Sequence, residues 1–427
     1  MPLGKNLKRA MEFTAIRTLL GFERVTSGVV WDPVTPGALA NPYPMYQRLR
    51  EKDRVHRSRL AGCYVLSRYE DVATVLKDDR FSANERNLPG FEKMHQKLVK
   101  QGVVDADEPD APMMLRSDPP DHTRLRTLVN KTFTPGAIRA LMPRIDEIVD
   151  QLVDELSPRG EMDVIADFAH ALPVIVIAEM LGIPSEDRAR FRHWSNEIVR
   201  NFGISNLDDA RASAQASREL RAYFESIAEE RRRSPKDDLL SGLLQAEEAG
   251  DRLSWDEVVG TLILLLVAGN ETTTNLIGNG MLALLHHPEQ LETLRGDPAL
   301  TEGAVEEMLR YDPPVQATSR ITLEDVEFQG GTIPRLNEVI VLIASANRDP
   351  EQFEAPDRFD LRRAENRHLS FGFGIHFCLG SHLARYEGRT AIRALVDRFP
   401  GIKLATDRLE WRGNPILRGL RSLPVRW

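Results

Sequence analysis

One of the two cysteines in this 427-residue chain, Cys378, lies in a glycine-rich segment, HLSFGFGIHFCLGSHLARYEG. Gly372 and Gly374 permit a tight turn before the sulfur, and a helical apolar pattern starts directly after it. At a helix N-terminus, the N–H groups and the helix dipole favour a thiolate, which can ligate a metal or attack carbon. The residues alone leave three interpretations open: a metal ligand, a nucleophile with His376 or His382 as its base, and an inert buried thiol.

A second set of reactive side chains lies in the sequence AGNETTTN at 268–275, which interrupts an otherwise apolar stretch. A buried acid beside a hydroxyl, here Glu271 and Thr272, is costly unless the pair handles protons or water. Gly269 weakens a helix, and a threonine hydroxyl can bond a carbonyl of the preceding turn. We therefore expect a bend or an opened helical hydrogen bond here; the alternative is a polar stripe that meets solvent.

The element that carries this segment is expected to be a long helix. Ser254 followed by Glu257 forms a capping box, and no proline then occurs before Pro288. The helix should span roughly 32 residues, or about 48 Å, which is enough to cross a whole domain. Further along, Glu307 and Arg310 stand three residues apart on one helical face and can form a charge-assisted pair, although this spacing alone is weak evidence.

The rest of the sequence indicates an α+β fold, mainly helical with a small β region. The stretch 134–156 has apolar residues at three- and four-residue steps, which is typical of an amphipathic helix. Strand patterns occur at 55–67, as a short hairpin, and at 321–347, which turns at Gly330-Gly331. Because no repeat or long linker divides the chain, we expect one domain.

Composition and charge exclude several classes of function. Hydrophobic residues make up 42% of the chain, which suits a globular protein with a large core. The net charge of −8 argues against nucleic-acid binding, and the longest apolar run, 262–268, is too short to cross a membrane. Two cysteines and the lack of a signal sequence favour a reducing, cytoplasmic location.

The first 31 residues are interpreted as an N-terminal extension to a domain that spans 32–427. The beginning of the extension is basic, with apolar residues spaced loosely like one helical face. In the first twenty-two residues, the charged residues are Lys5, Lys8, Arg9 and Arg17 against the single acid Glu12. Weak contact with a membrane surface is one interpretation. A terminal helix that packs on the protein itself is preferred, because polar residues break the apolar face.

Taken together, the motifs resemble those of the cytochrome P-450 family. Phe371, Gly374, Cys378 and Gly380 in FGFGIHFCLG are similar to the family's haem-binding loop, and AGNETT is similar to its oxygen-activation segment. The motifs follow one another in the family's order. The resemblance covers nearly the whole chain, from about residue 32 onward, and outweighs any single motif.

The ion-pair motif of the family is matched as well. Glu307 and Arg310 correspond to its Glu-x-x-Arg pair, and Arg358 in FEAPDRF resembles the third member of that triad. Upstream, DHTRLR places His122 and Arg126 at positions that hold haem propionates in the family.

The resemblance implies a single-domain cytochrome P-450 fold, with a long central helix over haem b and the cysteine loop on the opposite face. Cys378 would be the axial thiolate ligand of the haem iron. Thr272 would hydrogen-bond dioxygen or its water, and Glu271 would help deliver protons. The other implied cofactor-binding residues are His122, Arg126, Ala268, Gly269, Arg320, Phe371, Gly372, His376 and Gly380.

The implied activity is that of a monooxygenase that inserts one atom of O2, by hydroxylation or epoxidation, into a medium-to-large apolar substrate. Fatty acids, terpenoids or steroids, and macrolides are equal candidates. The segment 84–117 would form a lid. By family position, the pocket would be lined by Leu264, Val267, Val315, Gln316, Ala317, Ile416 and Leu417. The alternatives are a haem-based sensor or carrier without turnover, and a hydrolase with a cysteine nucleophile.

Electrons from NAD(P)H would arrive through a ferredoxin and its reductase. We expect the ferredoxin to dock near Arg116, Arg124 and Lys131, because a basic cluster would attract an acidic partner.

Overall fold

The computed structural model describes residue 16 and residues 18–103, 113–199, 207–248 and 253–427. The fold is mainly helical with small sheets, so the expected α+β class is confirmed. The larger helices are α3 (Tyr43–Lys52), α4 (Tyr69–Lys77), α5 (Phe91–Lys100), α6 (Asp121–Thr132), α7 (Pro135–Leu156), α8 (Ala171–Met180), α9 (Arg188–Val199), α10 (Leu207–Arg233), α11 (Leu239–Glu248), α12 (Trp255–His286), α13 (Pro288–Gly296), α14 (Thr301–Tyr311) and α16 (Ser381–Arg398). Two short helices are α2 (Pro36–Ala40) and α15 (Ile343–Ala346).

The long helix α12 forms as the sequence predicts and has 32 residues. The Ser254 hydroxyl accepts a hydrogen bond from the Glu257 N–H at 3.3 Å, and the Glu257 carboxylate accepts one from the Ser254 N–H at 2.8 Å. This capping box satisfies two N–H groups that the first helical turn leaves without a partner. The expected helix at 134–156 is also present as α7, with the Thr134 hydroxyl as its cap.

The main sheet has five strands in the order β1-β2-β8-β5-β3. Its hairpin at 55–67 is confirmed as β1 (His56–Arg57) paired antiparallel with β2 (Tyr64–Leu66). The second strand region was predicted in part. Strands β5 (Thr318–Thr322), β6 (Val326–Phe328), β7 (Gly331–Ile333) and β8 (Glu338–Val341) form there, but the chain then turns into α15. The remaining strands are β3 (Phe81–Ser82), β4 (Glu161–Asp163), β9 (Lys403–Leu404), β10 (Glu410–Trp411), β11 (Leu420–Ser422) and β12 (Pro424–Arg426).

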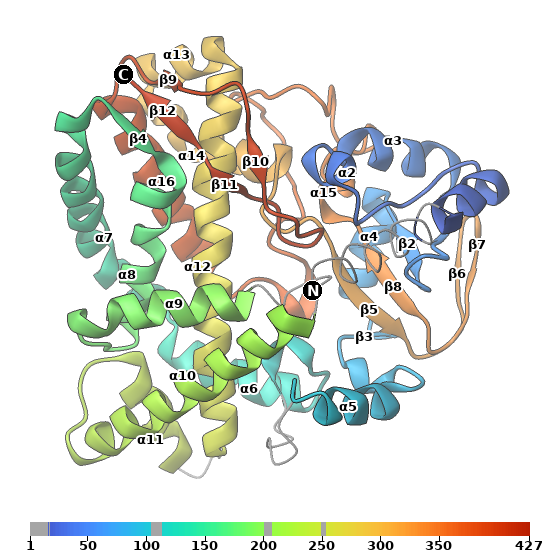
Figure 1. Ribbon diagram of the computed structural model, residues 1–427, viewed down its shortest axis with the longest axis horizontal. Helices are drawn as coiled ribbons and strands as arrows, with labels where there is room; N and C mark the ends of the chain where they lie inside the picture. The colour runs from blue at the N-terminus through green and yellow to red at the C-terminus, as the bar shows by residue number, and fades with distance from the viewer. Residues whose placement is uncertain (1–15, 17, 104–112, 200–206, 249–252) are drawn as a thin grey trace, which may run out of the picture.

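The helices and the main sheet occupy different parts of the molecule (Figure 1). On the left of the view, α12 runs the full height of the helical part, while β5, β8 and their neighbours lie on the right. Packing against α12 are α8, α16 and α14, among other elements, and they share one large hydrophobic core with it. Thus α12 is the central scaffold, and α16, which follows the cysteine loop, is held directly against it. Among the described residues, no helix is long and apolar enough to cross a membrane.

Candidate functional site: the Cys378 loop and the residues around it

The loop before Cys378 adopts the tight turn that its glycines predict. Gly372 and Gly374 have φ angles of +71° and +70°, which side-chain-bearing residues rarely adopt. A Cβ atom on Gly374 would lie 2.7 Å from the carbonyl oxygen of Leu76, so the loop also packs too closely against the end of α4 for a larger residue. The Cys378 N–H donates to the Phe371 carbonyl at 2.8 Å, and α16 begins three residues later. The sulfur is therefore fixed by backbone geometry.

The expectation that the helix terminus by itself yields a thiolate is wrong. Burial raises the pKa of the Cys378 thiol, and the opposing influences of the Gly380 N–H, Arg126 and Arg385 are smaller. A bound metal ion would displace the proton of this thiol. A base for a nucleophilic cysteine is also missing at His376, because burial and the nearby cations lower the pKa of His376 to about 3.

Four of the predicted cofactor-binding residues form a cationic cluster that lacks an anionic partner. The rings of His122 and His376 lie 4.2 Å apart, and both ring nitrogens of His122 are buried without a hydrogen-bond partner. Arg320 on β5 is 8% exposed and donates only to the neighbouring Ser319 carbonyl at 2.7 Å. Arg126 donates to the Phe377 carbonyl at 2.6 Å. Buried donors of this kind require an acceptor, and an anion would supply one.

The predicted oxygen-activation segment presents one open strip on α12. Ala268 is exposed, and Gly269 and Thr272 are partly exposed, whereas the residues on either side of them are buried. The Thr272 hydroxyl donates to the Ala268 carbonyl at 2.6 Å, which is the predicted bond to the preceding turn. The helix nevertheless remains α-helical throughout 255–286. Thr272 thus keeps its oxygen lone pairs directed out of the helix backbone and available to a ligand.

Glu271 is buried beside Thr272 and is held by an ion pair that the sequence did not indicate. Its carboxylate accepts from Arg412 Nη1 at 2.7 Å and from Asn275 Nδ2 at 3.3 Å. Arg412 follows β10, about 140 residues further along the chain, so no local spacing connects it with Glu271. Burial and the charge of Arg412 also lower the pKa of the neighbouring His170. To transfer a proton, Glu271 must therefore be released from Arg412.

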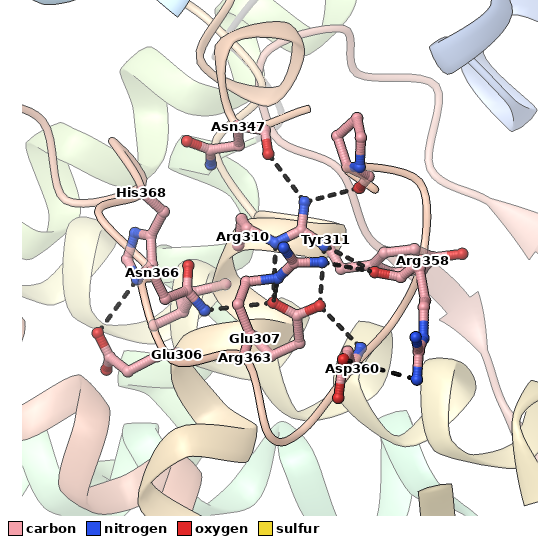
Figure 2. A network of polar contacts seen from close by, with 12 residues as sticks. Glu306, Glu307, Arg310, Tyr311, Asn347, Arg358, Asp360, Arg363, Asn366 and His368 are labelled. Atoms are coloured by element: carbon pink, nitrogen blue, oxygen red, sulfur yellow. Dashed lines mark hydrogen bonds and ion pairs between the residues drawn. The ribbon is translucent and has the colours of Figure 1, made fainter. Parts of the chain in front are cut away.

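The ion-pair triad forms, but its third member is not Arg358. Glu307 binds Arg310 through two bonds of 2.8 Å, and Arg363 Nε donates to Glu307 at 3.1 Å (Figure 2). The Arg358 side chain is 67% exposed and faces Asp360 at 3.7 Å. Arg358 contributes only its backbone carbonyl, which accepts from Arg310 and Arg363. The loop after α15 contains several arginines without regular spacing, so no sequence pattern distinguishes among them.

The predicted pocket residues fall into two groups. Val315 pairs with Leu417 in an isolated bridge, and the Gln316 N–H donates to the Ile416 carbonyl at 2.8 Å, so these two loops lie together. The side-chain amide of Gln316, however, bonds the Pro313 carbonyl at 2.8 Å and accepts weakly from a tyrosine. Leu264 and Val267 belong with Leu417, Phe371 and the partly buried Cys378 to one hydrophobic cluster, whereas Ala317 packs in another near the N-terminus.

The predicted basic docking cluster is largely neutralised. Arg116 pairs with Glu85 at 2.8 Å, and Arg124 pairs with Glu257, Nη1 to Oε2, at 3.1 Å. The side chain of Lys131 lies outside the described residues. Two of the three expected charges are thus shared with carboxylates, and attraction of an acidic partner to this cluster is weaker than predicted.

The residues around Cys378 fit a haem. In the part of the chain that the structure describes, no three His, Cys, Asp or Glu side chains gather as a metal site. The loop also exposes large apolar side chains, Phe373, Ile375 and Phe377, by 43%, 52% and 39%. A group with an apolar body and carboxylates would cover these three side chains. Its carboxylates would accept hydrogen bonds from His122 and Arg320. Haem b has both features.

This combination of a single cysteine ligand, a cationic cradle and a hydroxyl-bearing helix defines the haem-thiolate class of enzymes. Comparison with known proteins agrees, because the cytochrome P450 family model matches residues 61–406. The chain therefore belongs to the cytochrome P450 family. Of the three relatives named below, one is a hydroxylase by name and two bear the family name.

Three relatives illustrate the match. The polyketide biosynthesis cytochrome P450 PksS of Bacillus subtilis (strain 168) is 43% identical over 90% of this chain and 95% of its own length. The vitamin D(3) 25-hydroxylase of Pseudonocardia autotrophica is 43% identical over 93% and 95%, respectively. The crystal structure of P450BioI in complex with hexadec-9Z-enoic acid ligated acyl carrier protein has a TM-score of 0.84, 38% identity, and coverage of 92% of this chain and 100% of that one.

Proposed function

We propose that this enzyme inserts one atom of O2, by hydroxylation or epoxidation, into an apolar substrate of medium or large size. The observation that carries the proposal is the open strip of α12, where the partly exposed Thr272 adjoins the buried acid Glu271. The names of the three relatives concern a polyketide, a secosteroid and a fatty acid. These are the substrate types that the apolar residues Leu264, Val267 and Leu417 would accommodate.

Haem b, bound through Cys378, would supply the activation of O2, as it does in this family. His122, Arg126, Arg320 and His376 would hold its carboxylates and fix its orientation. Thr272 would hold a proton at its hydroxyl oxygen, close to the reacting dioxygen. Glu271 would replace that proton after its carboxylate leaves Arg412, so Arg412 is a positioning residue for proton delivery.

We further propose that the electrons come from NAD(P)H through a ferredoxin and its reductase, in the cytoplasm. Membership of the family supports the need for a redox partner, and the similarity to bacterial relatives supports the ferredoxin type. Arg116 and Arg124 are not carried forward as docking residues, because carboxylates already pair with them. Reconstitution with a ferredoxin and its reductase should give NAD(P)H-dependent turnover that omission of the ferredoxin abolishes.

The test of the oxygenase proposal is Thr272→Ala. We expect O2 and reductant to be consumed while product is lost and hydrogen peroxide appears, because the proton at Thr272 is missing. Thr274→Ala is the matched control, since the Thr274 hydroxyl is buried and donates to the Ala169 carbonyl at 3.1 Å. This control should keep its product yield. If Thr272→Ala formed as much product per reductant consumed as the wild type, the role assigned to Thr272 would be contradicted.

A haem-based sensor or carrier is the alternative function. It would bind O2 or another gas through the same cysteine-ligated haem, but it would not turn over an organic substrate. A panel of fatty acids, steroids and macrolides separates the two. Displacement of the axial water, seen as a haem spectral shift, followed by product formation supports the oxygenase, whereas gas binding without either supports the alternative.

A further inference from the structure

The N-terminal extension exposes an apolar stripe on an element that is otherwise firmly attached. Residues 18–27 are helical and lie at the right-hand edge of Figure 1, drawn in the darkest blue near β6 and β7. Leu19, Phe22 and Val25 stand three residues apart along this helix and are 41%, 52% and 84% exposed. On a helix, this spacing places the three side chains along one side.

The flank of the helix next to this stripe is fixed to the protein by a buried carboxylate. Glu23 is 1% exposed and accepts from His56 Nε2 at 2.8 Å, from the Trp31 N–H at 3.1 Å and from the Arg59 N–H at 2.8 Å. His56 also contacts Asp53 at 2.9 Å. The described helix at 18–27 therefore packs on the protein, so its exposed stripe belongs to an attached element.

Positive charge surrounds the stripe. Arg59, in the turn between β1 and β2, lies over the Phe22 ring at 4.9 Å, and Arg57 in the same hairpin stacks on Tyr64 at 4.6 Å. Arg24 is exposed on the helix itself. Within the described residues, none of these three arginines forms an ion pair with a carboxylate. The nearby acid Glu23 is buried and already paired, so the surface is both apolar and cationic.

We propose that this surface, made of Leu19, Phe22, Val25, Arg57 and Arg59, binds anionic phospholipid membranes. The three apolar side chains enter the boundary between headgroups and acyl chains, and the guanidinium groups bind the lipid phosphates. The first seventeen residues of the sequence are also positively charged overall, as binding to an anionic membrane requires. They contain Lys5, Lys8, Arg9 and Arg17 and the single acid Glu12.

A protein partner fits this surface less well than a membrane does. A stable protein interface takes roughly 20–30 residues from each side, with charged residues depleted at its centre. Here three apolar side chains stand beside Arg57 and Arg59, which form no ion pair within the described residues. A phospholipid surface needs no matching shape, and its phosphates supply the missing counter-charge.

The experiment is co-sedimentation of the haem-loaded full chain with vesicles of phosphatidylglycerol and phosphatidylcholine, against vesicles of phosphatidylcholine alone. We expect binding to the anionic vesicles that weakens as salt rises. The triple variant Leu19→Ser, Phe22→Ser, Val25→Ser should lower the apparent affinity at least about tenfold. The matched control Leu207→Ser, Leu323→Ser, at two side chains with 38% and 37% exposure elsewhere, should bind like the wild type.

A second variant keeps the proposal testable if the triple variant does not fold, as judged by the carbon monoxide spectrum of the reduced protein. Arg57→Glu with Arg59→Glu should lower affinity and flatten its salt dependence, whereas Arg218→Glu, on an exposed site of α10, should not. The proposal is overturned by a wild type that does not bind anionic vesicles, or by variants that bind as well as the wild type. It is equally overturned if the wild type dimerises without lipid and the triple variant does not. None of these outcomes depends on catalytic turnover, so they are separate from the proposed function.

Discussion

Two clusters of buried polar side chains are tied to the Cys378 loop, and they differ in how completely their hydrogen bonds are met. The first surrounds Glu307, and the second surrounds His122. In the first, all five N–H groups of Arg310 have acceptors: two on Glu307 and the backbone carbonyls of Asn347, Pro356 and Arg358 (Figure 2). This cluster is complete without any other molecule.

Glu307 is equally satisfied. Besides Arg310 and Arg363, it accepts from the Asp360 N–H at 2.9 Å and from Asn366 Nδ2 at 3.2 Å. Its carboxylate thus ties α14 to the loop that leads to Cys378. The fully paired charge fixes the path of this loop, which is a structural task.

In the second cluster, Arg126 and Arg320 donate only to backbone carbonyls among the described residues, and no carboxylate is hydrogen-bonded to them there. Both nitrogens of His122 lack a partner, and burial lowers the pKa of Arg320, with Asp118 opposing this effect. Buried donors that are left without acceptors destabilise the chain. The comparison indicates that buried polar groups with a full set of hydrogen bonds hold the scaffold together. Buried polar groups without partners mark where a ligand binds.

The largest effect is expected on breaking the complete cluster. Glu307→Gln leaves two buried arginines without their carboxylate, so we expect a loss of about 3–5 kcal/mol in the free energy of unfolding. Haem incorporation should fall with it, because the loop is no longer held. Urea denaturation and the haem absorbance per mole of protein measure both. A variant with normal stability would show that Glu307 is not the centre of the cluster.

A smaller effect separates the two arginines. Arg363→Ala removes a 10% exposed donor to Glu307, and a loss of about 1–3 kcal/mol is expected. Arg358→Ala removes a 67% exposed side chain and keeps its backbone carbonyl, so the change should stay within about 0.5 kcal/mol. Both are measured by urea denaturation. The reverse order of the two losses would restore Arg358 as the third member of the triad.

These two arginines show what the sequence could and could not predict. Spacing along a helix allowed the pair of Glu307 with Arg310, and the order of the motifs along the chain selected it. The capping box identified the start of α12, because it depends on neighbours within one turn. The third arginine lies in an irregular loop, where no period relates sequence to direction. Arg363 was therefore not found.

The same limit explains the other corrections. Arg412 meets Glu271 only because β10 packs near α12, and Glu257 neutralises Arg124 from a helix that is distant in sequence. Pairings of this kind depend on the tertiary fold. The thiolate expectation for Cys378 failed for a related reason, since the sequence shows the helix terminus but not the burial that outweighs it.

A mutation in the incomplete cluster should raise the free energy of unfolding of the haem-free chain, whereas a mutation in the complete cluster lowers it. His122→Phe removes two unpaired nitrogens, so the haem-free chain should be no less stable, and a gain of about 1 kcal/mol is expected. Haem release, followed by transfer to apomyoglobin, should accelerate at least about tenfold, because one charge-assisted hydrogen bond is lost. A haem-free variant that is less stable, together with unchanged haem release, would place His122 in the scaffold instead.

The last effect is a pH dependence confined to the incomplete cluster. Burial and the neighbouring cations lower the pKa of His376 to about 3, and burial also lowers that of His122. As pH falls below the ordinary histidine pKa of about 6.5, the two histidines bind protons in the unfolded chain but not in the folded chain. The free energy of unfolding of the haem-free chain should therefore fall by up to about 1.4 kcal/mol per pH unit for each histidine. Urea denaturation at several pH values measures the slope, which His376→Phe should reduce. Haem binding should reduce the slope too, because carboxylates beside the two imidazole rings would favour their charged form. An equal slope in the haem-free chain, the His376→Phe variant and the haem-loaded chain would mean that the cluster does not receive an anion.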